Sequence, residues 1–469
     1  MRELKVYKKT VSIVNETAIG MYENVVGKKT GFLLESYDKN YDRYTFFGAQ
    51  PEEIITSEKN SLVITKDDGT KEIRKGNPLE LLKEYYSDFN IIKDNEELSF
   101  SGGLVGNLGY DFVRYAEKLP DNNPDEIGIE TIQLMLMTKF LLVDHVAETL
   151  TAIILEKNDT EGEKRAYELA DELIRKARRT PKEVERKPLI HDGKIVKQSD
   201  NLSEYSRKVE KIKEYIKEGH IFQTVLSQRW TVETKQEGFD LYKELRELNP
   251  SPYLYYFNYG DFEVIGSSPE MIVKKQGNKV FTCPIAGTRK RGADKEEDEK
   301  LKQELLSDEK ERAEHVMLVD LARNDMGRIS EFGTVKVTQF MDVANYSHVM
   351  HIVSQVEGRK KGEFHPLDLV KSFLPAGTLS GAPKIRAMEI IDELESVRRG
   401  LYGGATGYID FSGDMDFCIT IRTMIKKKNK VYLQAGAGIV ADSVPENEYN
   451  ECCNKVMALA KTLVKEENL

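Results

Sequence analysis

The chain has 469 residues, which is too long for one ordinary hydrophobic core and predicts two domains or one large composite fold. Hydrophobic residues make up 40% and charged residues 32% of the sequence, a balance typical of a folded, soluble protein and not of a disordered one. The formal net charge of −10 excludes nucleic acid as the main partner, because no basic block offsets repulsion from the phosphates.

The N-terminal residues 1–7 show no apolar run behind a basic start, and no window of the sequence approaches the ~20 apolar residues of a membrane helix. We therefore expect neither a signal peptide nor a membrane partner. The four cysteines lack zinc-ligand spacing, and Cys452 is adjacent to Cys453, which excludes an ordinary disulfide between these two. These features predict a cytoplasmic protein with reduced thiols.

The first ~150 residues predict short strands and helices that are separated by frequent turns. The stretch 101–110 is rich in glycine, but it lacks the Gly-Lys-Ser of a phosphate loop and the spacing of a dinucleotide fingerprint. We interpret it as a strand packed closely against another backbone. Residues 151–155 predict a further strand, and the charged stretch 161–179 predicts a helix.

The stretch 181–200 contains Pro181 and Pro188 among many lysines and glutamates, and we interpret it as a linker. It divides the sequence into an N-terminal region, residues 1–180, and a second region, residues 201–469. In the second region long predicted helices alternate with short strands, and most of the candidate chemistry lies there.

The last helix is predicted to begin at a capping box, Ser443-Val444-Pro445-Glu446, with proline in its first turn. Its buried stripe is formed by Cys452, Val456, Leu459 and Leu463. Glu448 lies one turn before this stripe, and Glu451 shares its side of the helix. Two inward carboxylates require a cation; alternatively, both lie at the rim, where the helix dipole favours them.

A second amphipathic helix is predicted over residues 309–322, and Glu314 borders its apolar stripe. Magnesium takes oxygen ligands from one or two carboxylates and completes its shell with water and substrate oxygens. This chemistry is a reason to pair Glu314 with Glu448 and Glu451, although sequence position does not establish that the three meet. A cation held in this way would draw an anionic substrate into an acidic protein.

Four sequence blocks occur in an order that resembles the chorismate-utilising enzymes, namely anthranilate, aminodeoxychorismate, isochorismate and salicylate synthases. The blocks run from Pro284 to Arg289, Leu318 to Asp325, Gly377 to Lys384 and Gln434 to Val440. Each block alone is a weak signal, but their shared order is specific, and the likeness extends from roughly Ser203 to the C-terminus, with a weaker likeness over the first ~120 residues. The resemblance implies an α+β composite fold, in which antiparallel β-sheets pack as a sandwich with helices outside.

The resemblance also implies a role for each matching residue. Glu314, Glu448 and Glu451 match the family's Mg²⁺ site. Glu270 matches the general acid that protonates the hydroxyl leaving ring carbon 4, and His351, unlike His348, matches a histidine associated with the later loss of pyruvate. The positions that match substrate-carboxylate contacts are Thr288, Tyr402, Arg422, Lys455 and the backbone amides near Gly436 and Gly438.

Each of these positions also has an ordinary explanation when it is considered alone. Arg422 in a strand pattern suits a surface ion pair, Tyr402 suits simple packing, and a Gly-Ala-Gly run suits a tight turn. It is their order in the sequence that favours the catalytic interpretation.

Two positions favour an aminating member of the family, the anthranilate synthase branch. Family members that add water carry a lysine base where this chain has Gln223, which cannot deprotonate water. Ammonia is already a nucleophile and needs no such base. Aminodeoxychorismate synthases typically carry a nucleophilic lysine at the position of Ala286.

Two further segments resemble those that form a tryptophan feedback pocket in anthranilate synthases. The matching residues are Glu35, Ser36, Asn249, Pro250 and Tyr253. A rigid turn would also explain the Asn-Pro-Ser-Pro run. Some aminodeoxychorismate synthases bind tryptophan in a similar pocket without regulation, so inhibition by tryptophan is a separate expectation from the reaction.

None of the four cysteines lies in a Gly-x-Cys-x-Gly nucleophile turn, so we expect a separate glutaminase subunit to supply ammonia. The expected reaction converts chorismate and ammonia to anthranilate and pyruvate, with Mg²⁺, in tryptophan biosynthesis. The alternatives are an aminodeoxychorismate synthase, whose product retains the pyruvyl ether, and a non-catalytic tryptophan sensor.

Overall fold

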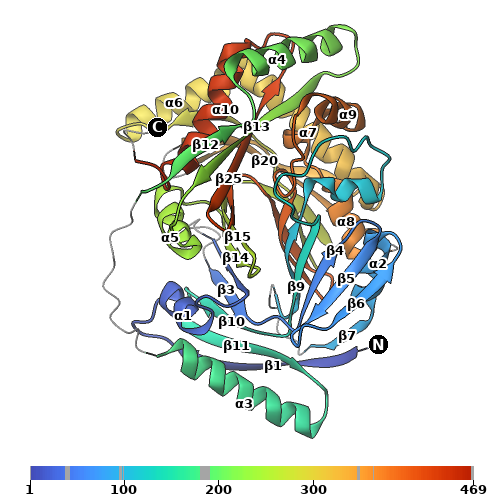
Figure 1. Ribbon diagram of the computed structural model, residues 1–469, viewed down its shortest axis with the longest axis vertical. Coiled ribbons are helices and arrows are strands. Elements are labelled where there is room, and N and C mark those ends of the chain that lie inside the picture. The colour runs from blue at the N-terminus through green and yellow to red at the C-terminus, as the bar shows by residue number, and fades with distance from the viewer. Residues whose placement is uncertain are drawn as a thin grey trace.

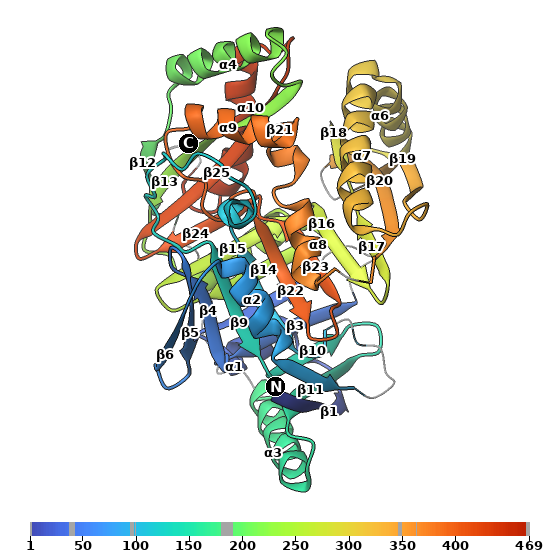
Figure 2. The same cartoon turned by 90° about the vertical axis from the view of Figure 1, so that its right-hand side faces the viewer.

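The computed structural model describes residues 2–36, 43–93, 98, 100–179, 191–345, 349–362 and 364–465. Within these residues two large β-sheets pack face to face, and helices cover the outer face of each sheet (Figures 1 and 2). The predicted α+β sandwich with helices outside is therefore confirmed.

The first sheet contains thirteen strands among the described residues. In spatial order they are β12 (Lys194–Gln198), β13 (Gln223–Glu233), β25 (Lys430–Ile439), β24 (Thr423–Lys427), β15 (Phe262–Ser268), β14 (Tyr253–Asn258), β2 (Gly31–Glu35), β3 (Tyr44–Ala49), β10 (Lys139–Asp144), β11 (Thr149–Glu156), β1 (Arg2–Ser12) and β7 (Phe89–Ile92), with β21 (Gly381–Ala382) beside β13. Neighbouring strands are antiparallel apart from β1 and β7.

The second sheet contains twelve strands among the described residues, and their pairings are antiparallel. In spatial order they are β18 (Ile285–Lys290), β20 (Val349–Arg359), β17 (Lys279–Thr282), β16 (Met271–Gln276), β23 (Met415–Ile419), β22 (Ala405–Asp410), β8 (Gly103–Leu108), β9 (Ile132–Met137), β4 (Glu53–Ser57), β5 (Ser61–Lys66) and β6 (Lys71–Lys75), with β19 (Lys336–Asn345) paired to β20.

The helices bury their apolar faces on the outer sides of the two sheets. Those on the first sheet are α1 (Ala18–Val25), α3 (Thr160–Ala177), α4 (Leu202–Lys217), α5 (Gly238–Leu248), α9 (Lys384–Leu394) and α10 (Pro445–Ala460). Those on the second sheet are α2 (Pro78–Ser87), α6 (Lys295–Ser307), α7 (Glu309–Ile329) and α8 (Pro366–Phe373). Two short 3₁₀ helices, η1 (Tyr110–Tyr115) and η2 (Gly377–Leu379), lie in connections.

Aromatic side chains fill the space between the sheets. Phe32 and Phe257 point inward from the first sheet, and Val105 and Tyr408 meet this cluster from the second. Full burial of one such side chain contributes about 1.5–3 kcal/mol, so this shared core strongly couples the two sheets.

The glycine-rich stretch 101–110 forms β8, as predicted. A Cβ atom at Gly106 would overlap the carbonyl oxygen of Gln133 on β9, and one at Gly103 would overlap that of Ile409 on β22. The strand therefore lies between two close backbones, and glycine is required there.

The predicted division at residues 181–200 does not separate two folded bodies. β2 of the N-terminal region pairs with β14, and β8 pairs with β22, so both sheets draw strands from either side of this stretch. Residues 181–190 of the predicted linker lie outside the described residues, and Lys194–Gln198 forms β12, an edge strand on β13. The adjacent β-branched pair Ile195 and Val196 favours a strand despite the flanking lysines.

The helix predictions are confirmed with one correction. Residues 161–179 correspond to α3 and residues 309–322 to α7, which extends further, to Ile329. The last helix begins at Pro445, but the predicted capping box is wrong. Val444 is the N-cap and its side chain makes no capping bond, while the Ser443 hydroxyl accepts a hydrogen bond from the backbone N–H of Val440 at 3.0 Å.

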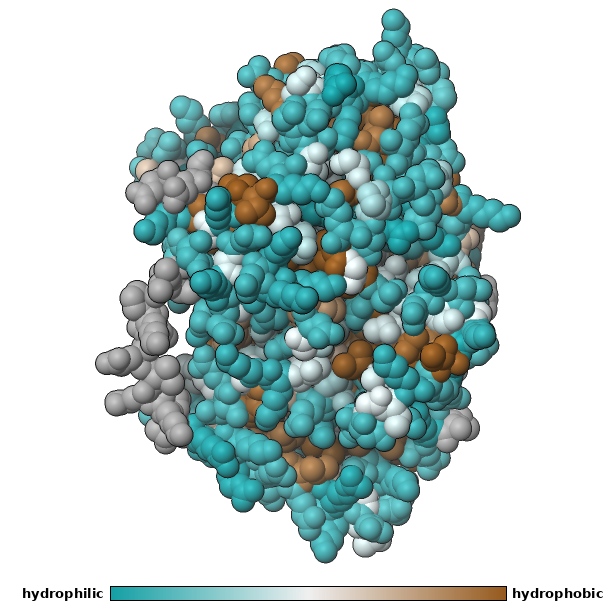
Figure 3. Space-filling model, viewed as in Figure 1, coloured by the Kyte–Doolittle hydropathy of each residue, from teal (hydrophilic) through white to brown (hydrophobic). Residues whose placement is uncertain are grey.

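Hydrophilic residues cover most of the face seen in Figure 3, and hydrophobic residues appear there in small separate groups. Across the described residues, no helix combines the length and the apolar content needed to cross a membrane.

The shared sheets predict that the second region does not fold alone. A fragment of residues 191–469 would leave β14 and β22 without their partners β2 and β8, exposing two long central strand edges. We expect this fragment to aggregate and to show no cooperative transition in urea, followed by circular dichroism. Co-expression with residues 1–190 is expected to restore the transition, and cooperative unfolding of the fragment alone would contradict the prediction.

Candidate active site

The glycines predicted to bind substrate lie where β25 pairs with β13. Gly438 is opposite Val225 in this register. A Cβ atom at Gly438 would lie 2.6 Å from the Gln223 amide nitrogen, and one at Gly436 would lie 3.0 Å from the Tyr402 hydroxyl. Glycine therefore lets these two side chains lie across the strand, and the structure brings all four predicted residues together.

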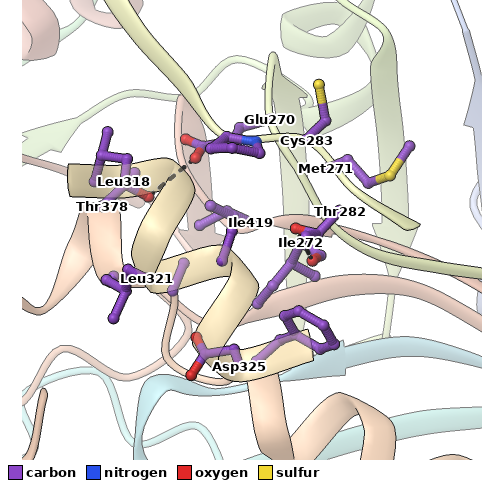
Figure 4. Close-up of a pocket in the computed structure, with 15 residues that line it drawn as sticks. Glu270, Met271, Ile272, Thr282, Cys283, Leu318, Leu321, Asp325, Thr378 and Ile419 are labelled. Carbon is purple, nitrogen blue, oxygen red and sulfur yellow. Dashed lines mark hydrogen bonds between the residues drawn. The ribbon is translucent and has the colours of Figure 1, made fainter. Parts of the chain in front are cut away.

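Glu270, two residues after β15, is buried beside a pocket with Thr378 of η2 (Figure 4). The Thr378 hydroxyl donates a hydrogen bond to Glu270 Oε1 at 3.0 Å. Burial raises the pKa of Glu270 to about 8, against the smaller lowering effects of Thr378 and of the charge on Lys455. Glu270 therefore holds its proton at neutral pH, as a general acid requires.

The pocket beside Glu270 is lined largely by apolar side chains, which accounts for this desolvation. Leu318 and Leu321 come from α7, and Ile419 comes from the end of β23. Asp325 lies at the opposite side of the pocket from Glu270 in Figure 4, and its Oδ2 accepts a hydrogen bond from Lys384 Nζ at 2.8 Å.

His351 on β20 lies beside Gly287 and Thr288, where the pairing of β18 with β20 is irregular. Its Nδ1 lies 2.8 Å from the carbonyl oxygen of Gly287 and 3.1 Å from the Thr288 hydroxyl. Because a carbonyl only accepts, Nδ1 carries the proton in that bond and Nε2 carries the lone pair of the neutral ring. Burial lowers the pKa of His351, and the charge of Arg422 lowers it further, so the imidazole is neutral at neutral pH.

Arg422 lies between β23 and β24 with a φ of +50°, a left-handed conformation that is unfavourable for a side chain of this size. Burial lowers the pKa of its guanidinium. No carboxylate within the described residues forms an ion pair with it, so an anion bound beside His351 would compensate a desolvated charge.

The three glutamates predicted to bind metal lie in one neighbourhood, on α7 and α10. Burial, and next the charge of Glu311, raise the pKa of Glu314, and the charge of Glu451 raises it further. Burial likewise raises the pKa of Glu448, with Glu451 adding to the effect. Lys455 Nζ lies 2.6 Å from Glu451 Oε1 and donates to the carbonyl of Gly436 at 3.0 Å.

These carboxylates do not yet form a coordination sphere. Within the described ranges, no three side chains of His, Cys, Asp or Glu lie close enough together to hold a metal ion as they stand. The structure thus brings the predicted residues near one another, across the two helices α7 and α10, without fixing a metal position.

The two segments predicted to bind tryptophan lie side by side. Glu35 ends β2 opposite Leu254 of β14, and its carboxylate accepts hydrogen bonds from Tyr242 at 2.5 Å and Arg246 at 2.9 Å. The Ser36 hydroxyl is buried and finds no hydrogen-bond partner among the described residues.

The second of these segments begins at the end of α5. Asn249 caps that helix, and its side chain donates to the carbonyl of Ala458 at 3.4 Å. Tyr253 begins β14, and its hydroxyl donates to Asp416 at 2.9 Å. Pro250 lies between them, so all five predicted residues belong to one region of the structure.

Sequence reasoning missed four residues that the structure places at the site. Thr378 belongs to the block from Gly377 to Lys384, and no function was assigned to it from the sequence. Its hydroxyl within a signature block was a feature that could have indicated one. Glu311 lies one turn before Glu314, with its carboxylate 3.5 Å from Arg289. Glu395 and Arg399 gave no signal, because a Glu and an Arg four residues apart are common on exposed helices.

Comparison with known proteins agrees with this arrangement. The chorismate binding enzyme family matches residues 31–461. Anthranilate synthase component 1 of Acetivibrio thermocellus is 47% identical over 459 residues, which cover 96% of this chain and 93% of that protein. The protein of the same name from Aquifex aeolicus is 43% identical over 468 residues, covering 96% of this chain and 92% of that protein. The crystal structure of anthranilate synthase component I from Streptococcus pneumoniae TIGR4 superposes with a TM-score of 0.78 at 40% identity, covering 89% of this chain and 92% of that chain.

The raised pKa of Glu270 predicts a specific pH dependence of stability. Between its ordinary value of 4.5 and its folded value of about 8, the unfolded chain loses this proton while the folded chain keeps it. The folded state therefore loses stability as pH rises through this window, by up to ~1.4 kcal/mol per pH unit. We expect Glu270→Gln to remove this loss, so that its advantage in thermal unfolding grows from pH 4.5 to pH 8 and is constant above.

The control is Glu84→Gln on the exposed face of α2, where water solvates the side chain in both states. Equal pH profiles for wild type and Glu270→Gln would show that the Glu270 carboxyl is not desolvated.

Proposed function

The chain belongs to the chorismate binding enzyme family, and we propose that it converts chorismate and ammonia to anthranilate and pyruvate. The observation that carries this proposal is the similarity, over nearly the whole chain, to anthranilate synthase component 1 proteins at 43% and 47% identity. The buried acid Glu270, the neutral His351 and the guanidinium of Arg422, which forms no ion pair within the described residues, are the chemical groups that the reaction needs.

The substrate is a dianion, and the cations of the site suit its carboxylates. Arg422 presents a planar fork of donors and has no ion-pair partner among the described residues. The hydroxyls of Tyr402 and Thr288, the ammonium of Lys455, and the backbone amides near Gly436 and Gly438 add further donors. Their spread over β18, β25 and α10 supports binding of both carboxylates of chorismate.

The first chemical step uses the proton that Glu270 holds. Glu270 protonates the hydroxyl at ring carbon 4, which leaves as water while ammonia adds at ring carbon 2 and the ring double bonds shift. His351 then promotes elimination of pyruvate and aromatisation. Its neutral ring, with the lone pair on Nε2, is suited to accept the proton of ring carbon 2 while the bond from ring carbon 3 to the pyruvyl oxygen breaks, and the departing enol takes up a proton to become pyruvate.

The metal expected for this reaction is Mg²⁺, which Glu314, Glu448 and Glu451 would hold. The residues fit a cation, because burial and mutual repulsion raise the pKa of Glu314 and Glu448, and a divalent ion would relieve both effects. When bound, the ion would supply positive charge for the ring carboxylate of chorismate.

Two side chains support ammonia as the nucleophile and anthranilate as the product. Gln223 is buried against Gly438, and an amide cannot take a proton from water, which argues against addition of water. Ala286 on β18 is buried and offers no nucleophile, which argues against an aminodeoxychorismate synthase.

A separate glutaminase subunit is the proposed source of ammonia in the cell. None of the four cysteines lies in a nucleophile turn, and the relatives are named as component 1, which supports a second component. Tryptophan is the proposed inhibitor, and the buried Ser36 hydroxyl beside Glu35 is a hydrogen-bonding group available to such a ligand.

The reaction is tested with the purified chain, chorismate, an ammonium salt and Mg²⁺ at alkaline pH, by following anthranilate fluorescence. We expect fluorescence that EDTA abolishes, and none when glutamine replaces ammonium. Glu448→Gln is expected to require at least 10-fold more Mg²⁺ for half-maximal rate, because one charged ligand is lost. Chorismate consumption into a non-fluorescent amino product would indicate an aminodeoxychorismate synthase, and untouched chorismate would leave the sensor alternative.

The tryptophan site is tested by a variant that fills it. Ser36→Val replaces the buried hydroxyl with a larger apolar group, so we expect tryptophan binding in calorimetry to weaken at least 10-fold. Activity without tryptophan should stay at the wild-type level, because the Ser36 hydroxyl forms no hydrogen bond with Glu270, His351 or Arg422 or any other described residue. Unchanged tryptophan affinity in Ser36→Val, or no binding by wild type, would contradict this assignment.

A further inference from the structure

A buried ion pair lies directly behind the active site, at the end of α9. Glu395 and Arg399 are four residues apart, and their side chains are 3% and 2% exposed. Arg399 donates to the two carboxylate oxygens of Glu395 at 2.6 and 2.9 Å. In the proposed reaction neither group has a role of its own.

The remaining donors of Arg399 hold two backbone segments of the site. Its Nη1 donates to the carbonyl of Leu379 at 2.6 Å, and its Nη2 donates to the carbonyl of Val225 at 2.8 Å. Leu379 follows Thr378, the hydrogen-bond donor to Glu270, and Val225 lies opposite Gly438. The Arg399 guanidinium therefore links the segment that carries Thr378 to β13, the strand paired with Gly436 and Gly438 of β25.

The face of the same guanidinium lies over two aromatic rings. It is 5.6 Å from the ring centre of Tyr402 and 4.6 Å from that of Tyr110. Tyr402 is the side chain whose hydroxyl lies against Gly436, so Arg399 also fixes a proposed substrate contact.

Glu395 extends the network along β13 to β25. Its Oε1 accepts hydrogen bonds from the backbone N–H and the hydroxyl of Ser227, at 2.9 and 2.7 Å. The Ser227 hydroxyl in turn accepts from Gln434 Nε2 at 2.8 Å. Ser227 lies opposite Gly436, so the Glu395 carboxylate also holds the pairing of β13 and β25 at Gly436.

A buried ion pair of this kind often adds little to the free energy of unfolding. Removing two charges from water costs more than their attraction returns in many proteins, and apolar replacements are often neutral. Its value lies in geometry, because the planar guanidinium presents donors in fixed directions that a lysine does not reproduce.

We propose that Glu395 and Arg399 form a positioning pair. The pair holds Thr378, which contacts the general acid Glu270, together with the Tyr402 ring and the paired strands β13 and β25 in the arrangement that catalysis requires. This inference rests on the proposed function, since it concerns the same site. It assigns to the pair the relative placement of Glu270 and of the proposed carboxylate contacts.

The test is Arg399→Lys, which keeps the charge and the pairing with Glu395 but cannot reach both carbonyls. We expect kcat/KM for chorismate, with ammonium as cosubstrate, to fall about 100-fold, since misplacement by about 1 Å costs that much. The matched control is Arg386→Lys on α9, the helix that Glu395 caps, where Arg386 pairs with Glu389 at a partly exposed position. It is expected to retain wild-type kinetics.

A second variant separates positioning from folding. Glu395→Gln combined with Arg399→Met removes both charges together, so we expect a melting temperature near that of wild type and the same loss of about 100-fold. If Arg399→Lys does not fold, this double variant tests the positioning role in its place. Folded protein with wild-type kcat/KM, in either variant, would overturn the inference.

The pH profile gives a readout that a merely structural role would not move. Burial raises the pKa of Glu270, while the hydrogen bond from Thr378 and the charge of Lys455 lower it. The neighbouring Cys283 thiol is uncharged at neutral pH, because burial and Glu270 raise its pKa to about 12. Displacement of Leu379 and Thr378 should therefore shift the alkaline limb of kcat upward in Arg399→Lys, and an unshifted limb would count against the inference. Failure of the proposed function is distinguishable, because wild type and Arg386→Lys would then produce no anthranilate either.

Discussion

The register between β13 and β25 is the constraint on which the rest of the site depends. The two strands pair over ten positions, which place Gly436 opposite Ser227 and Gly438 opposite Val225. A shift of one residue would turn both glycines to the other face of the sheet. β25 leads into α10 with Glu448, Glu451 and Lys455, and β13 pairs with β21 beside η2. One strand pair thus fixes the position of Gly436 and Gly438, of the carboxylates on α10 and of the segment that carries Thr378.

The electrostatics of the site follow from this placement. An acidic chain gathers carboxylates of α7 and α10 near one another, where burial makes their charge unfavourable. Lys455 lies among them, and Arg422 lies beside His351. The site therefore contains one region that suits a cation and another that suits an anion, and the proposed reaction, with its expected metal ion and its dianionic substrate, requires both.

Much of this could be predicted from the sequence, because the four signature blocks in a fixed order indicated the family, which the family model over residues 31–461 confirms. Glu270 and His351 lie outside these blocks and were matched to the family one position at a time. The strand around Gly106 and the long helix beginning at Glu309 also followed from local patterns. The linker prediction was wrong for its C-terminal part, because Ile195 pairs with Val232 of β13, which is distant in the sequence. The capping box failed because Ser443 bonds to Val440 and leaves Val444 as the cap. A local pattern does not show which strand a segment will pair with, or which neighbouring backbone group will bond a side chain that could otherwise cap a helix.

Several residues of the site break local rules of protein structure, whether or not the sequence indicated them, and the packing of the sandwich explains how they are tolerated. Arg422 adopts a left-handed backbone, Glu270 holds a proton in a desolvated pocket, and Glu395 with Arg399 buries two charges. Each feature opposes folding by an amount of order 1–3 kcal/mol or more. Such costs persist only where the surroundings overdetermine the conformation, and here these residues are held by two sheets that both draw strands from either half of the chain. The interleaved sheets are therefore a requirement of the site, because a smaller or divided fold would relax these groups into their ordinary states.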